Sequence, residues 1–146
     1  MKISTKGEYG IRALLELSWR YGEGYIQSSE IAAAREIPEN YLYQLLISLR
    51  KAGIILSRRG PQGGHTLARA PEAVSLAEAV LALEGPLAVT ACVQDDVIHD
   101  CLRSGFCPVR SVWEKVTRAT QEILESTSFA QLVEEERARR KEQSPD

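Results

Sequence analysis

The stretch around Gly53 changes its hydrophobic period, and this change constrains the fold more than any other feature of the chain. Before Gly53, four leucines recur three or four residues apart, as on the buried face of one α-helix: Leu42, Leu45, Leu46 and Leu49. After Gly53, the segments ILSRR and HTLAR are typical of short strands, and RGPQGG between them is typical of a tight turn. We therefore expect a helix that ends near Gly53, followed by a β-hairpin.

A shorter helix is expected just before the leucine-rich one. It begins with Ser28 or Ser29 as its N-cap and runs to Arg35, and Pro38 suits the first turn of the next helix. Two helices joined by a tight turn and followed by a basic hairpin are typical of a winged helix-turn-helix. In that fold the second helix lies in the major groove, and the hairpin contacts phosphate or the minor groove.

Helical periodicity continues on both sides of this unit. Helices are expected over residues 5–21, 71–83 and 108–124. The third of these carries an apolar stripe, which consists of Val109, Val112, Val116, Ala119 and Ile123. The DNA-binding half has little room to bury this stripe, so we expect a second copy of the same helix to cover it in a two-fold homodimer. The alternative is that the stripe packs within its own subunit.

The predicted fold class is mainly α with a small β hairpin, in which a winged helix-turn-helix domain precedes a long dimerisation helix. We expect the DNA-binding domain over residues 1–84 and a cysteine-rich loop over residues 85–107. The dimerisation helix and a C-terminal helix follow over residues 108–133, and residues 134–146 form a charged, partly disordered tail. No apolar run approaches the roughly 18 residues of a membrane span, and the N-terminus lacks an apolar signal segment, so a cytoplasmic location is expected.

Charge is divided unevenly along the chain, although the net charge is only −2. Residues 1–69 hold ten basic and six acidic side chains, whereas residues 70–146 hold eight and fourteen. A basic first half can bind the phosphate backbone of DNA even in a protein with an acidic isoelectric point. An enzyme is not expected, because the sequence has no phosphate-binding loop, nucleophile elbow or HExxH motif. The basic hairpin also argues against a module that binds only proteins.

All three cysteines of the chain, Cys92, Cys101 and Cys107, fall within one sixteen-residue stretch. An odd number cannot pair completely within one chain, and three thiolates on a turn-rich loop can hold an iron–sulfur cluster or zinc. Zinc is disfavoured, because structural zinc sites usually pair ligands two to four residues apart and these cysteines are further separated. A metal-free redox pair with a spare thiol and accidental clustering remain the alternatives.

Several stretches together resemble the IscR/NsrR-type family of bacterial winged-helix regulators. They are MKISTKGEYGIRALLEL, YLYQLLISLRKAGII, SRRGPQGGHTLAR, the three-cysteine loop and CPVRSVWEKV, and the similarity covers residues 1–133. The resemblance implies a homodimeric repressor or activator that binds pseudo-palindromic promoter DNA. It also implies a [2Fe-2S] or [4Fe-4S] cluster held by the three cysteines.

The resemblance implies a fourth cluster ligand less clearly. Arg110, which cannot ligate, stands where the iron–sulfur assembly regulators have a histidine. In the nitric-oxide-sensing branch, an acidic residue of the partner subunit serves, and its counterpart here is Glu8. His99 is a second candidate, and Asp95, Asp96, Asp100 or an external ligand are the others. The first cysteine spacing is also longer than in several members of the family, which leaves the cluster type open.

The predicted DNA-facing residues follow from the helix geometry and from the resemblance together. They are Ser28, Asn40, Tyr41, Tyr43, Gln44, Ser48, Arg58, Arg59, Gly60, Gly63, Gly64 and His65. Asn and Gln side chains can bond to adenine edges, whereas the tyrosines pack or reach phosphate. Arg59 corresponds to the minor-groove arginine of the family. His65 stands where tyrosine is usual, and we expect it to pack at the base of the hairpin and not to sense pH.

Overall fold

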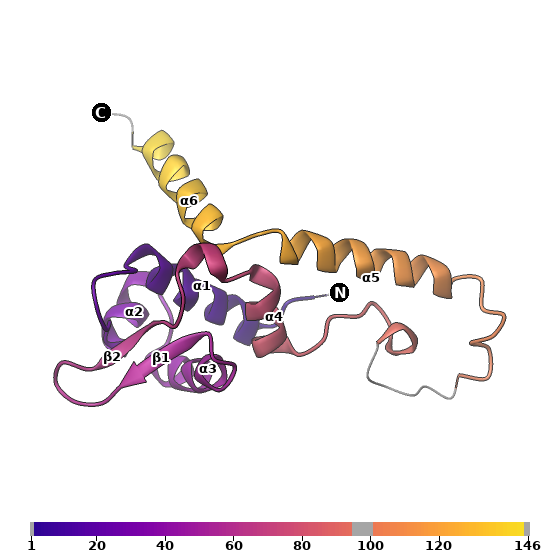
Figure 1. Ribbon diagram of the computed structural model, residues 1–146, viewed down its shortest axis with the longest axis horizontal. Helices are drawn as coiled ribbons and strands as arrows, with labels where there is room; N and C mark the ends of the chain where they lie inside the picture. The colour runs from indigo at the N-terminus through magenta and orange to yellow at the C-terminus, as the bar shows by residue number, and fades with distance from the viewer. Residues whose placement is uncertain (1, 95–100, 145–146) are drawn as a thin grey trace.

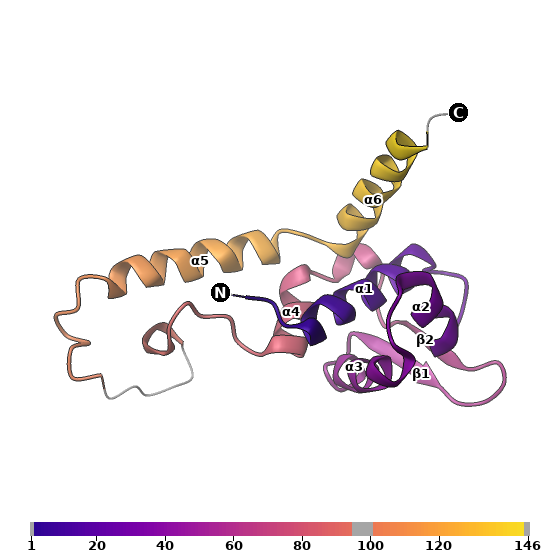
Figure 2. The ribbon, with the colours of Figure 1, turned by 180° about the vertical axis from the view of Figure 1, so that it is seen from behind.

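The computed structural model describes residues 2–94 and 101–144 and has the predicted winged helix-turn-helix architecture (Figure 1). The DNA-binding half comprises α1 (Thr5–Trp19), α2 (Ser28–Arg35), α3 (Glu39–Lys51), β1 (Ile55–Arg58) and β2 (Gly64–Leu67). It is followed by η1 (Pro71–Ala73), α4 (Leu76–Glu84), η2 (Ala91–Val93), α5 (Arg110–Glu125) and α6 (Phe129–Gln143). Opposite views show α5 pointing away from the body formed by α1 to α4 (Figure 2).

One apolar core joins the elements of the DNA-binding half. The four leucines of α3 are buried in it, as their spacing predicted, and they pack with Leu14 and Leu17 of α1. Helix α1 lies at the centre of this half and packs against α2, α3, α4 and α6. Gly10 permits the close approach of α4, because a side chain there would collide with Leu83. The burial of α1 therefore sets the spacing of the surrounding helices.

The hairpin is antiparallel, and its register pairs Ile55 with Leu67 and Ser57 with His65. A further bridge joins His65 to Ile26, in the segment just before α2. The backbone of Ile26 exchanges two hydrogen bonds of 2.8 Å with that of His65. The hairpin is thus attached to the helix-turn-helix by its backbone as well as by the chain connection.

Two helix starts differ from the sequence-based expectation. Ser28 is the first residue of α2, and the N-cap is Gln27. The backbone N–H of Gln27 donates to the Glu30 carboxylate at 3.2 Å. The helix expected from Pro71 is interrupted, because Val74 is extended and buried. Helix α4 then begins after Ser75, whose hydroxyl accepts from the Glu78 amide at 3.1 Å. In both cases the observed helix start carries a capping box, formed by Gln27 with Glu30 and by Ser75 with Glu78.

The C-terminal region is more ordered than its charge suggested. The sequence predicts a charged, partly disordered tail over residues 134–146, and in the structure α6 continues to Gln143. Phe129 and Val133 bury the start of α6 in the body. Further along, the guanidinium groups of Arg137 and Arg140 lie over the ring of Trp19, at 4.7 and 5.1 Å from its centroid. These contacts supply the anchoring that composition alone does not reveal.

A shielded ion-pair cluster links α1, α2 and α6. Arg35 Nε lies 2.7 Å from Glu16 Oε2, and Arg35 Nη1 lies 2.8 Å from Glu136 Oε1. The side chains of Arg35 and Glu16 are only 9% and 10% exposed. Burial alone would raise the pKa of Glu136, but hydrogen bonds from Arg35 and Arg140 outweigh it and hold the pKa below its usual value. Arg35 therefore holds the end of α2, the first helix of the helix-turn-helix, against both α1 and α6.

Replacing Arg35 should destabilise the whole DNA-binding half. We expect Arg35→Ala to lower the free energy of unfolding by about 3 kcal/mol, because Glu16 is left shielded from water without its cation. Urea unfolding followed by circular dichroism at neutral pH measures this change. As a matched control, Arg139→Ala breaks the exposed Arg139–Glu135 pair and should cost less than about 0.5 kcal/mol. Equal losses in the two variants would contradict the assignment.

Candidate nucleic-acid interface and cysteine loop

The outward face of α3 carries most of the predicted base-reading residues. Asn40, Tyr43 and Gln44 are exposed on the side opposite the buried leucines. Ser48 is half-buried, and its hydroxyl donates to the Gln44 carbonyl at 3.3 Å. Ile47 is also exposed on α3, at 44%, and sequence reasoning missed it. The amide groups of Asn40 and Gln44 are therefore accessible to the edges of bases, with an apolar side chain beside them.

Tyr41 has a structural contact as well as an exposed edge. Its ring packs edge-on against Tyr9 of α1, with the ring centroids 5.4 Å apart and an interplanar angle of 74°. The guanidinium of Arg12 lies over the other ring of this pair, 5.4 Å from the centroid of Tyr9. The geometry favours the packing role for Tyr41, because its ring helps to fix the start of α3 on α1.

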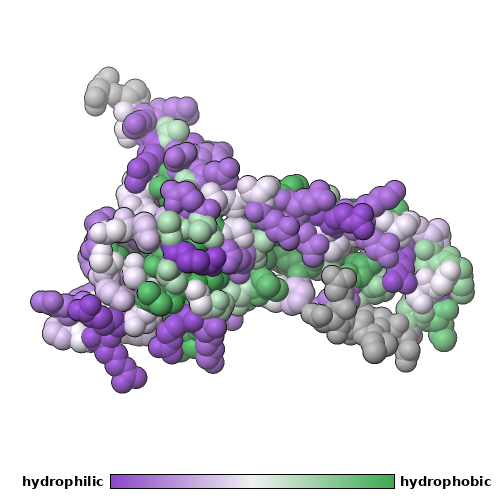
Figure 3. All heavy atoms as spheres, viewed as in Figure 1, coloured by the Kyte–Doolittle hydropathy of each residue, from purple (hydrophilic) through white to green (hydrophobic). Residues whose placement is uncertain are grey.

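The hairpin presents two adjacent arginines. Arg58 and Arg59 are both exposed, and the guanidinium of Arg58 lies 5.2 Å from the centroid of the Tyr25 ring. Hydrophilic side chains project from the lower side of the body, where α3 and the hairpin lie (Figure 3). Arg50 and Lys51 at the end of α3 are also exposed. This side of the body is thus lined by basic groups that can approach phosphate.

The glycines of the hairpin have distinct structural roles. Gly60 has φ +107° at the turn, a backbone conformation that residues other than glycine rarely adopt. Gly63 and Gly64 lie where a side chain would collide with backbone, that of Arg58 in the first case and that of Ile26 in the second. Gly64 therefore permits the hairpin to reach the segment before α2.

His65 is the most connected polar residue of the hairpin. Its Nε2 lies 3.0 Å from the Ser28 hydroxyl, and its Nδ1 lies 2.8 Å from the Ser57 hydroxyl. Burial and, to a smaller degree, the charge of Arg50 lower the pKa of the imidazole below its ordinary value. Both effects favour the neutral imidazole, which lies half-buried at the base of the hairpin.

Several residues of this surface were missed in the sequence. Ser57 is one of them, although its place opposite His65 follows directly from the hairpin register. Gln27 is another, and its Nε2 donates to the Pro61 carbonyl at 3.2 Å. Tyr9 and Tyr25 are the others. Tyr9 packs on Tyr41 of α3, and Tyr25 packs on Arg58 of the hairpin. Each pair is far apart in the sequence, so no local signal could have identified these contacts.

The cysteine loop leaves the body between α4 and α5 (Figure 1). Cys92 and Cys107 are half-buried and Cys101 is exposed, and all three are free thiols. Cys92 lies in η2, where its Sγ is 3.0 Å from the Thr90 hydroxyl. Glu8 is exposed in the first turn of α1. The other candidate ligands, His99, Asp95, Asp96 and Asp100, lie outside the residues that the structure describes.

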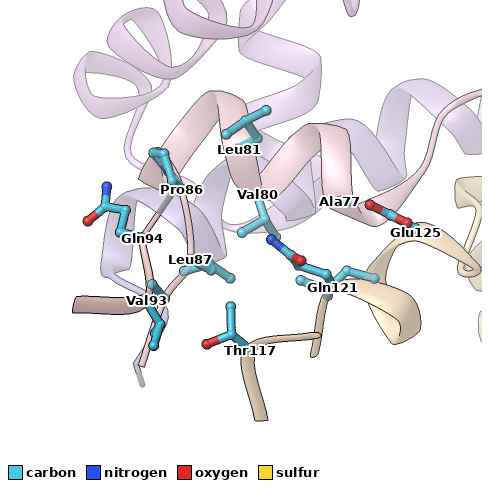
Figure 4. A pocket seen from close by; sticks show the side chains of 13 residues that line it. Ala77, Val80, Leu81, Pro86, Leu87, Val93, Gln94, Thr117, Gln121 and Glu125 are labelled. Carbon is cyan, nitrogen blue, oxygen red and sulfur yellow. The ribbon is translucent and has the colours of Figure 1, made fainter. Parts of the chain in front are cut away.

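The segment that carries Cys92 is packed against α5. The Val89 amide lies 3.5 Å from the Thr117 hydroxyl of α5, at hydrogen-bonding distance. A hollow of about 220 Å3 lies beside this contact, and side chains from α4, α5 and the connecting segment surround it (Figure 4). Val80 of α4 and Val93 of η2 contribute to its apolar lining. The loop is thus joined at its start to the helix that follows it.

Within residues 2–94 and 101–144, nothing covers the apolar stripe of α5. Val112 is 48% exposed, Val116 40% and Ile123 65%, whereas Thr117 on another face of the helix is buried. The predicted alternative, in which the stripe packs within its own subunit, is therefore wrong for these positions. Hydrophobic atoms also gather at the outer end of the molecule in Figure 3, and the loop residues Leu102 and Phe106 are largely exposed.

Comparisons with known proteins agree with this architecture. The family model of Rrf2, described as an iron-dependent transcriptional regulator, matches residues 3–135. The chain belongs to the Rrf2 family of transcriptional regulators. It is 35% identical over 133 residues to the HTH-type transcriptional regulator CymR of Bacillus subtilis. This match covers 91% of the chain and 90% of CymR. The Rrf2 family consists of transcriptional regulators and not of enzymes, as expected from the sequence.

Solved structures of Rrf2-family relatives resemble the chain closely. The global cysteine regulator CymR of B. subtilis matches with a TM-score of 0.75 and 34% identity, over 92% of this chain and 97% of that one. IscR of T. potens matches with a TM-score of 0.74 and 36% identity, over 92% and 88% of the two chains. The oxidized form of Staphylococcus aureus CymR matches with a TM-score of 0.71 and 32% identity, over 92% and 97%. The predicted resemblance to IscR-type winged-helix regulators is confirmed.

The donors of the cysteine loop fit an iron–sulfur cluster in kind, but they are not assembled into a site. Three thiols suit a soft metal centre, and none of them is buried in the core or paired in a disulfide. Over residues 2–94 and 101–144, however, no three cysteine, histidine or acidic side chains come close enough to hold one metal.

Among those same residues, no helix has the length and apolar character needed to cross a bilayer.

Proposed function

We propose that this Rrf2-family protein is a homodimeric regulator that binds promoter DNA and changes its DNA affinity with the state of its loop cysteines. The observation that carries the proposal is the adjacency of two surfaces on one side of the body. The amide-bearing face of α3 can enter a major groove, and the arginine-bearing hairpin lies beside it. Asn40 and Gln44 would supply base contacts, and Arg58 and Arg59 would supply phosphate or minor-groove contacts.

A second copy of the chain supplies what a palindromic site requires. The exposed stripe on α5 is apolar along the length of the helix, from Val109 to Ile123. Burying these side chains against the same stripe of a partner removes them from water and relates the two DNA-binding halves by a two-fold axis. Two recognition helices could then contact half-sites about one helical turn of DNA apart.

Cys92, Cys101 and Cys107 are the residues that would hold an iron–sulfur cluster in this proposal. When bound, the cluster would supply one-electron redox chemistry and sensitivity to oxidants and nitric oxide. The chain's own part is to order the loop, because Cys92 lies in η2 within it and Cys107 ends it just before α5. Glu8, from the partner subunit, is the proposed fourth ligand. The packing of Val89 on Thr117 supports a route by which loop order could reach α5.

A metal-free thiol switch is the second candidate. The similarity to CymR favours it, since one CymR relative is known in an oxidized form. In this case Cys101, the most exposed thiol, would react first, because oxidation follows exposure and thiolate character. Both candidates place the sensor in the same loop and leave the DNA-binding surface unchanged.

Substitutions in the two DNA-facing elements should have different signatures. We expect Gln44→Ala to weaken binding to a selected operator by about 1–3 kcal/mol and to relax its base preference. Arg59→Ala should weaken binding to all duplexes and reduce the slope of log K against log salt by about 0.9. Fluorescence anisotropy over a range of KCl concentrations measures both. Arg139→Ala, which removes an exposed charge from α6, is the control, and equal effects of all three variants would argue against this surface.

A charge in the α5 stripe should separate the subunits. Val116→Glu would bury a carboxylate at the proposed interface, and we expect a monomer at micromolar concentration with a large loss of operator affinity. Arg118→Glu introduces the same side chain on the opposite face of α5 and should leave the dimer intact. Light scattering coupled to size exclusion gives the mass of each. A wild-type monomer, or a dimeric Val116→Glu variant, would exclude this interface.

The cysteine proposal is tested by anaerobic purification with absorption spectra and counts of iron and acid-labile sulfide. We expect matched iron and sulfide in the wild type and their loss in each Cys→Ser variant. Glu8→Ala should shorten the lifetime of the cluster absorption, whereas Glu142→Ala, at the far end of α6, should not. A colourless protein that resists reconstitution would instead support the thiol switch. Operator affinity that is equal with and without the cluster would rule out cluster sensing.

A further inference from the structure

A chain of side-chain hydrogen bonds crosses from the hairpin to the helix-turn-helix. Ser57 of β1, His65 of β2 and Ser28 of α2 are joined through the two ring nitrogens of His65, at 2.8 and 3.0 Å. A neutral imidazole has one donor and one acceptor, and a hydroxyl can act as either, so both bonds can be satisfied at once. Three elements are thus held by one ring.

The backbone on its own attaches the hairpin at a single place. The Ile26–His65 bridge contributes one pair of backbone hydrogen bonds, and it is an isolated bridge. At the turn, the Gln27 side chain also donates to the Pro61 carbonyl at 3.2 Å, and Ile55 and Leu67 anchor the two strands in the core. The imidazole bonds add two side-chain contacts next to the bridge, because Ser28 follows Ile26 in the chain and Ser57 belongs to the other strand. They therefore restrain the part of the hairpin that leads to the arginines.

We propose that His65 is a positioning residue for DNA binding, which fixes the angle of the arginine-bearing hairpin relative to α2 and α3. This inference rests on the proposed DNA-binding function and adds to it. Ser57 directly precedes Arg58 and Arg59 in the chain. The bond between Ser57 and His65 therefore fixes the position of the backbone from which the two arginine side chains extend. The bond to Ser28 determines the same position relative to the start of α2. His65 acts through the arginines and does not itself contact DNA.

The burial of His65 agrees with this role. The imidazole is half-buried, and its pKa is lowered by burial and by the nearby Arg50, which favours the neutral form that can bond to both serines. Removing the ring should leave the fold intact, because the Ile26–His65 backbone bonds and the apolar pair of Ile55 with Leu67 persist. The expected loss therefore concerns the orientation of the hairpin and not its existence.

A double-mutant cycle tests the proposal. The probe is a duplex of about 30 base pairs, selected by the wild-type protein from a random-sequence pool. We expect His65→Ala to weaken binding about tenfold in the wild-type background, but less than about threefold when Arg58 and Arg59 are already alanine. In a Gln44→Ala background it should keep its full tenfold effect. A residue needed only for stability would weaken binding equally in both backgrounds.

Further measurements keep the proposal open to refutation. Thermal unfolding without DNA verifies that each variant is folded; should His65→Ala fail to fold, Ser57→Ala, which removes only the Nδ1 bond, takes its place in the same cycle. Equal effects of the His65 substitution with and without the arginines, or no effect at all, would overturn the positioning role while leaving DNA binding established. Failure of the wild-type protein to select any duplex would overturn the proposed function, and this inference with it.

Discussion

Helix α1 is buried between the helix-turn-helix, α4 and α6, and its packing determines where every surface of the DNA-binding half lies. Gly10 lets α4 approach closely, Tyr9 packs on the start of α3, and Glu16 pairs with Arg35 at the end of α2. A single helix thus makes an apolar contact, an aromatic contact and a shielded ionic contact with three different neighbours. The ionic contact is the least tolerant of change, since a charge shielded from water without its partner costs several kcal/mol.

The same cluster connects the two ends of the molecule. Glu136 of α6 shares Arg35 with Glu16, and α6 follows α5 after a short connection. A displacement of α5 would therefore move α6 and, through the Glu136–Arg35 ion pair, change the position of α2. The cysteine loop packs on α5 at Thr117, α5 packs on α4, and α4 packs on α1 and α3, so contacts lead from the candidate sensor to the candidate DNA-binding surface. Packed side chains and helices of this kind can carry coupling between two sites.

Much of the architecture could be predicted because it depends on local patterns. The leucine spacing of α3, its end near Gly53 and the turn glycines of the hairpin are each set by neighbouring residues, and all are present in the structure. The exposed face of α3 followed from the buried one. The length of α6 did not follow from the sequence, because the contacts of α6 with Trp19 and Arg35 involve residues about one hundred positions away. Composition carries no information about such partners.

By itself, the sequence determined the winged helix-turn-helix, the family, the outward residues of α3 and the grouping of three thiols in one loop. These follow from periodicity, turn chemistry and motif, which act over a few residues. Only the tertiary structure decided that Ser57, His65 and Ser28 form one connection, that Tyr41 packs on Tyr9, and that the α5 stripe is left exposed by the residues that the structure describes. The physical reason is distance along the chain: such contacts depend on how separate elements pack, and packing is settled by the whole core at once.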